Sequence, residues 1–215
     1  MRLRTDLVLL AIAVVLGGIG LFMNSQATFA SNYVRDQLTA EKITFSPADK
    51  LTAEEKSWKA GSSCLVQYGG QQMSTGPQAE CYANYFIDLH MSEATAAIGY
   101  PGQTYGSIGS VQSQLRADIA TAQKNNDTAA AAAAQKKLDA VNGVRDTLFK
   151  GDMLRSALLT VYGFSVLGSV AGTAATLCYA GAAFFVLFAA FAFMRGRAPV
   201  AVPQREPSGG VVSAR

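Results

Sequence analysis

Two long apolar runs dominate the pattern of hydrophobic and polar positions along the chain. The first covers residues 7–23 and the second residues 156–194, and neither contains a charged residue. The first run measures about 25 Å as a helix, which is near the lower limit for crossing an apolar bilayer core about 30 Å thick. We therefore predict a transmembrane helix over 7–26 that continues outside the membrane and ends near 43–47, because Pro47 disfavours helix at the preceding residue.

A cleaved signal peptide is the alternative for this first run. The run is longer than the apolar core of a usual signal peptide, and the candidate cleavage site at Thr28-Phe29-Ala30 matches the small-residue pattern poorly. The sequence therefore favours an anchor that is retained.

The second run has thirty-nine residues, which is too long for one crossing and just long enough for a tight pair of crossings. A pair would leave the C-terminus outside, although Arg195 and Arg197 follow the run directly. We therefore predict a single crossing over 173–194. The helix would begin near Met153 and approach the membrane from outside.

The charged residues predict the orientation. Residues 1–6 and 195–215 carry six arginines and two acidic residues, whereas 24–155 carries twelve basic and thirteen acidic residues. Because positive flanks mark the cytoplasmic side, we expect a cell-membrane protein with both termini cytoplasmic, a disordered tail over 195–215 and residues 27–172 outside. The near-neutral outer segment lacks the basic face that nucleic-acid binding requires.

The outer segment has the pattern of helices. Apolar positions recur at helical spacing in 104–125 and again in 128–150, separated by Asn125-Asn126-Asp127. These two arms predict an antiparallel helical hairpin with a coiled-coil type of contact. The fold class is therefore an all-α membrane protein with a transmembrane helix near each end and an extracytoplasmic helical domain containing the hairpin.

Small residues recur four apart in both apolar helices, as in helix pairs that pack closely in membranes. The predicted packing positions are Ala13, Gly17, Ala27 and Ser31 on the first helix and Gly168 and Gly172 on the second. Counting from the inner ends predicts an antiparallel pair in which Gly172 and Gly168 face Ala27 and Ser31. The alternative is that small residues are simply common in membrane helices.

Two of the three cysteines lie in the outer segment. In an oxidising compartment Cys64 and Cys81 would form a disulfide that closes the loop containing 68–72. Two free thiols are the alternative. Cys178 lies within the second span and is expected to be a small packing residue.

Candidate chemistry is sparse. His90 is the sole histidine, close to Asp88 and Glu93 in sequence. A single histidine with scattered acids is more typical of a surface residue than of a metal or catalytic site, so we predict no enzyme activity and no cofactor. A cluster of aromatic residues suits either a ligand groove or, as we favour, a domain core. Its members are Tyr68, Tyr82, Tyr85, Phe86 and Tyr105.

Several stretches resemble a set of uncharacterised two-pass membrane proteins of actinobacteria. The resembling stretches lie at 33–45, 70–76, 83–87, 102–105 and 148–155. This resemblance implies the two-pass architecture and no particular activity.

The leading hypothesis is a non-enzymatic envelope protein whose outer domain binds another protein, or a second copy of the chain, or senses a signal. The second is an extracytoplasmic module that binds a small molecule or a lipid. A channel or transporter subunit ranks last, because transport paths usually carry ionisable residues and the two apolar runs contain none.

Overall fold

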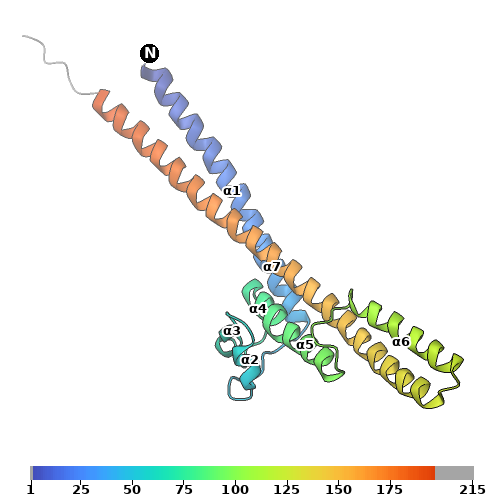
Figure 1. Cartoon of the computed structure of the whole chain (residues 1–215). Coiled ribbons are helices and arrows are strands. Elements are labelled where there is room, and N and C mark those ends of the chain that lie inside the picture. Colours follow the sequence, from blue (N-terminus) through green and yellow to red (C-terminus); the bar gives the residue numbers. More distant parts are fainter. Residues whose placement is uncertain (1, 197–215) are drawn as a thin grey trace, which may run out of the picture. The chain divides into compact units, whose positions relative to one another are not determined.

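The computed structural model describes the backbone of residues 2–196 and the side chains of residues 7–195. The helices in chain order are α1 (Arg2–Ala40), α2 (Ala53–Ser57), α3 (Ser63–Gln67), α4 (Gly76–Cys81), the π-helix η1 (Tyr82–Ile87), α5 (Asp88–Ala97), α6 (Ile108–Lys124) and α7 (Thr128–Gly196) (Figure 1). Within the described range, β-type pairing is limited to an isolated bridge between Thr44 and Gln72. The described part of the chain is therefore all-helical, as predicted.

Two of these helices, α1 and α7, are long and apolar enough to cross a membrane. The second apolar run lies entirely within α7, which is unbroken from residue 128 to residue 196, so no turn divides residues 156–194 into two helices. From residue 197 onward the predicted disordered tail lies outside the described residues, and 195–196 belong to α7.

The chain divides into two compact units. The terminal unit comprises residues 1–23 and 174–215, and the central unit comprises residues 24–173. In the terminal unit, small side chains are buried, namely Ala13, Ala175 and Ala189. Most of the larger apolar side chains in this unit are exposed.

The central unit contains the remainder of α1 and α7 and all the shorter helices. α1 ends at Ala40, a few residues before the predicted end, because Lys42 adopts a left-handed φ of 54° that helix cannot continue through. Beyond it the chain is extended: the Phe45 amide donates to Gln71 O and the Met73 amide donates to Ile43 O. These bonds attach the loop after α1 to the loop before α4.

Two capping boxes define the starts of α2 and α4. The Thr52 hydroxyl accepts from the Glu55 amide at 3.1 Å, and the Glu55 carboxylate accepts from the Thr52 amide at 2.7 Å. Thr75 and Gln78 form the same reciprocal pair at α4. From Gly76 the chain stays helical through α4, η1 and α5 to Ala97.

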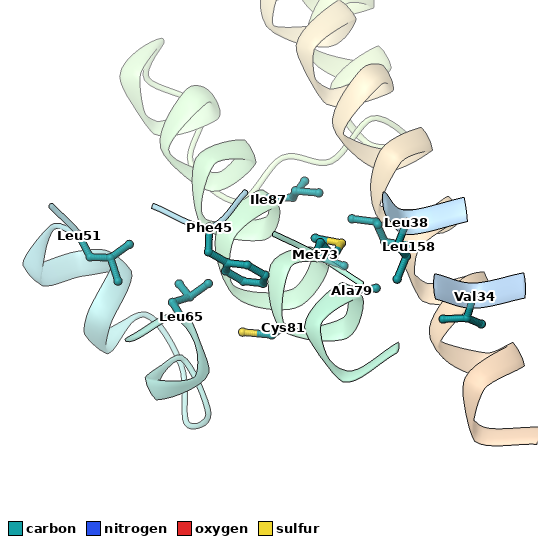
Figure 2. Packing of buried hydrophobic residues seen from close by; sticks show 11 residues of the cluster. Val34, Leu38, Phe45, Leu51, Leu65, Met73, Ala79, Cys81, Ile87 and Leu158 are labelled. Carbon is teal, nitrogen blue, oxygen red and sulfur yellow. The ribbon is translucent and has the colours of Figure 1, made fainter. Parts of the chain in front are cut away.

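Two apolar clusters hold the central unit together. The first joins Val34 and Leu38 of α1, Phe45, Met73 and the helices α3 to η1 with Leu158 of α7 (Figure 2). The second lies between α6 and the first part of α7 and is built from Ile108, Leu115, Leu138, Val141 and Leu148. These positions recur at helical spacing on both helices, so each helix presents an apolar face to the other.

Candidate functional site

The Asp88 carboxylate at the start of α5 joins three segments of the central unit that are far apart in the chain. It accepts a hydrogen bond from Trp58 Nε1 at 3.0 Å and is paired with Lys59 Nζ on one oxygen. On the other oxygen it pairs with Arg155 Nη1 of α7 at 3.3 Å. The same guanidinium donates from Nη2 to Asn84 Oδ1 at 3.2 Å. Asp88 thus links the loop after α2, α5 and α7.

These partners decide the charge of Asp88. Partial burial alone would raise the pKa of this carboxyl. The hydrogen bonds from Lys59 and Trp58, with the charges of Lys59 and Arg155, outweigh burial and lower the pKa of Asp88 below its ordinary value. A carboxylate held charged by three donors suits a structural link better than proton transfer.

His90 is placed beside Glu55 rather than Glu93. Its Nε2 lies 3.9 Å from Glu55 Oε1, and its Nδ1 lies 2.8 Å from Phe86 O. The Glu55 carboxylate is already occupied by the capping box of α2. Among the described residues no group of three or more His, Cys, Asp or Glu side chains is arranged to hold a metal ion.

The five candidate groove aromatics fall into two separate places. Tyr82 stacks on Phe86 at 4.6 Å and meets Phe45 edge-on at 5.4 Å, and Tyr68 also contacts Phe45 at 5.5 Å. Four of the candidates pack against the first apolar cluster, namely Tyr68, Tyr82, Tyr85 and Phe86. Burial, followed by the negative charge of Glu55, raises the pKa of Tyr82.

Tyr105 belongs instead to the second apolar cluster. It contacts Phe149 at 5.4 Å and lies 5.0 Å from the Arg145 guanidinium. Arg145 in turn donates to the buried Gln112 at 2.8 Å, and Gln112 donates to Asn142 at 2.6 Å. The candidate residues therefore form core contacts in two clusters rather than one common groove.

Cys64 and Cys81 form the predicted disulfide, with a Cα–Cα distance of 6.1 Å. The bond ties the start of α3 to the end of α4 across the loop that contains 68–72. Cys178, in α7, is the free cysteine of the described residues.

The helix-packing candidates of the central unit lie along a line of close contact between α1 and α7, here called the central seam. A Cβ added to Gly168 would lie 2.8 Å from Ala30 Cβ, and one added to Gly172 would lie 3.6 Å from Ala27 Cβ. Gly168 therefore meets Ala30, one residue before the predicted Ser31. Ser31 is exposed beside the seam.

The terminal unit has its own close approach. A Cβ added to Gly20 would lie 2.8 Å from the Tyr179 ring, and one added to Gly181 would lie 3.3 Å from Leu16. Ala13 is buried, but a Cβ added to Gly17 would meet nothing within 4 Å. Gly20 is thus the glycine of α1 in the terminal unit at which an added Cβ would overlap α7.

A cleft of about 570 Å³ lies beside the central seam. Residues 27–35 of α1, 74–77 at the start of α4 and 162–169 of α7 line it. On one side of the cleft Gly76 packs directly on the Ser165 hydroxyl, where any side chain would overlap it. The start of α4 thereby closes one side of the groove between α1 and α7.

This cleft was not apparent from the sequence. Of its serines, only Ser31 is a predicted packing residue, and the contact between Gly76 and Ser165 joins positions far apart in the chain. Nothing in the sequence indicates what the start of α4 packs on.

Comparison with protein-family models, curated proteins and solved structures finds no match.

Proposed function

We propose that this chain is an integral membrane protein of the cell envelope, with spans at 7–26 and 173–194, both termini in the cytoplasm and residues 27–172 outside. The observation that carries the proposal is the exposure of apolar side chains on α1 and α7. In the most apolar stretch of each helix only 11% and 6% of the residues are buried. The core helix of a soluble protein would be mostly buried.

The size of the exposed groups makes water an unfavourable surrounding. Val14, Leu21, Leu177 and Leu187 are each more than 60% exposed. Burying one such side chain is worth about 1.5–3 kcal/mol, and lipid tails provide that apolar environment without protein contacts. The positive flanks at both ends favour the inward orientation of the termini.

The structure around Ala30 supports retention of the first span. α1 is helical through 28–30, and Ala30 is buried against Gly168 in the central unit. A peptidase site there would have to be extended and accessible. Gly20 also packs on Tyr179 in the terminal unit, a contact that cleavage would remove.

We propose further that the outer domain is non-enzymatic and binds another protein or a second copy of the chain. Its polar clusters, centred on Asp88 and Gln112, are engaged in links between helices. The first turns of α7, residues 128–134, form an alanine-rich surface at the end of the α6–α7 pair, with Ala132 and Ala133 exposed. Short side chains there would let a partner helix approach closely.

Site-specific photo-crosslinking tests this proposal in native membranes. A crosslinker at Ala133 is expected to capture a defined adduct, and one at Gln67, also exposed in the central unit, serves as the matched control. An adduct of twice the chain mass would identify a second copy as the partner. Equal, diffuse labelling at both positions would contradict the proposal.

A small-molecule or lipid-binding role is the second candidate, and the cleft of about 570 Å³ favours it. Ligand pockets commonly measure about 300–1,000 Å³. The cleft lies beside the central seam and not among Tyr68, Tyr82 and Phe86.

A further inference from the structure

The cleft occupies a particular place along the two long helices. On α1 its first residue, Ala27, directly follows the proposed span, and on α7 its last residue, Ser169, comes four residues before the second span. Both helices are continuous through these points. At 1.5 Å per residue, Ala27 and Ser169 lie about 2 and 6 Å beyond the span ends, within the depth of lipid headgroups.

Exposed aromatic side chains occur beyond these points on both helices, with Phe29 about 5 Å, Tyr33 about 11 Å and Phe164 about 14 Å from the span ends. Tyr33 contacts Phe29 at 5.9 Å and Phe164 at 5.6 Å between ring centres, and all three side chains are exposed. None of them lines the cleft. Aromatic residues concentrate where a membrane meets water, so this group supports an outer membrane surface near the cleft.

The lining of the cleft combines an apolar wall with hydroxyl groups and a cation. Val34 and Val166 contribute apolar surface, while Ser31 and Ser169 contribute hydroxyl groups. Neither serine side chain makes a hydrogen bond to another described residue, so both remain available to a ligand. The cation is Arg35 of α1.

The Arg35 guanidinium has hydrogen-bond donors without a partner among the described residues. Its Nε lies 3.4 Å from Asp36 Oδ1, and the side chain is 60% exposed. The two terminal nitrogens therefore remain available, in the planar arrangement that binds two phosphate oxygens together. Helix side chains tilt toward the N-terminus of their helix, which on α1 is the direction of the proposed span.

We propose that the cleft binds the phosphodiester headgroup of a phospholipid from the outer leaflet. Arg35 contacts the phosphate, Ser31 and Ser169 donate to its oxygens or to the glycerol esters, and the upper part of an acyl chain lies along Val34 and Val166. This inference rests on the proposed topology, because a lipid reaches the cleft only if residues 27 and 169 lie at the membrane surface.

The test measures binding of dioctanoyl phosphatidylglycerol to the full-length, delipidated protein by native mass spectrometry. Arg35→Glu reverses the charge in the cleft, and Ser31→Leu fills it from an exposed position. Arg116→Glu, on an exposed arginine of α6, and Asn32→Leu, on the neighbouring exposed position of α1, are the matched controls. Dioctanoylglycerol and inorganic phosphate are run as separate ligands.

The expected result is one retained phospholipid on the wild-type chain and both controls. Arg35→Glu should weaken retention by about tenfold or more, as loss of a charged hydrogen bond does, and Ser31→Leu should weaken it comparably. Dioctanoylglycerol should bind more weakly than the phospholipid. Equal retention by all variants would overturn the proposal, and so would inorganic phosphate that displaces the lipid at similar concentration, since that would indicate a free-anion site.

Alkaline carbonate extraction of the source membranes is performed first. If the chain leaves the membrane, the proposed topology is wrong and the lipid site falls with it. If the chain stays while Arg35→Glu and Arg116→Glu retain lipid equally, the lipid site alone is wrong.

Discussion

Replacing Gly168 with alanine should push α1 and α7 apart in the central unit. The new Cβ would lie 2.8 Å from Ala30 Cβ, whereas carbon atoms rest about 3.5–4.0 Å apart. One helix must therefore move by about 1 Å, and a gap of that size removes a quarter to a half of each neighbouring contact energy. Overpacking of this kind costs about 1–3 kcal/mol.

The same helix supplies matched controls. A Cβ at Gly163 would meet nothing within 4 Å, and one at Gly172 would make ordinary contact at 3.6 Å. All three substitutions gain the same helix propensity, about 1 kcal/mol. The difference between Gly168→Ala and Gly163→Ala therefore isolates the cost at the central seam.

The assay is thermal unfolding of the full-length protein in nanodiscs, followed by far-UV circular dichroism. A cost of about 1–3 kcal/mol corresponds to a Tm about 2–12 °C lower for a chain of this size, so Gly168→Ala should melt below Gly163→Ala by that margin, with Gly172→Ala close to Gly163→Ala. Indistinguishable melting of the three variants would refute the packing argument.

Three further predictions concern the central unit. Cys64→Ser should lower stability by about 3 kcal/mol, as loss of a short disulfide loop does, whereas Cys178→Ala should leave the melting temperature nearly unchanged. The pKa of Asp88 is lowered in the folded protein. Its contribution to the free energy of unfolding is therefore present above the unfolded pKa of about 3.9 and is lost as pH falls through the folded pKa. The Tm of Asp88→Asn should thus depend less on pH below about 4 than the Tm of the wild type. Gln112→Ala removes the hydrogen-bond partner of Asn142 and Arg145 on α7 and should lower the free energy of unfolding by about 1–3 kcal/mol in a denaturant titration. An equal effect from Gln114→Ala, at an exposed position, would contradict this.

Local signals explain what could be predicted from the sequence. The capping box at Thr52 and Glu55 joins residues only three apart, so its pattern can be recognised from the sequence. The disulfide between Cys64 and Cys81 followed from the compartment that the topology implies. The two long apolar helices were predicted from uncharged runs long enough to cross a bilayer core.

Contacts between distant residues account for what was missed. The Asp88 link requires Trp58 and Arg155 to converge on α5, and no sequence spacing encodes that meeting. Gly17 and Gly20 look alike in sequence, yet a Cβ added to Gly20 would meet Tyr179 in the terminal unit and one added to Gly17 would meet nothing within 4 Å. The cleft depends on where α4 packs on α7, which is decided by the whole first apolar cluster.

The aromatic residues illustrate the same limit. Tyr82 and Phe86 are four apart on a helix and their stacking is a local matter, but the chain between them is a π-helix. Tyr105 is close to them in sequence and belongs to another cluster because the loop after α5 leads it to α6. Composition alone indicated a cluster but not its division between two cores.

The most direct test of the two-span topology is labelling of single cysteines with a membrane-impermeant maleimide in intact cells. One cysteine replaces the exposed Ala133 of α7, and another is added after the last residue, both in a Cys178→Ala background that keeps the disulfide. Position 133 should be labelled in intact cells and the C-terminal cysteine only after permeabilisation. Labelling of the C-terminal cysteine in intact cells, or protection of position 133, would contradict the proposed topology.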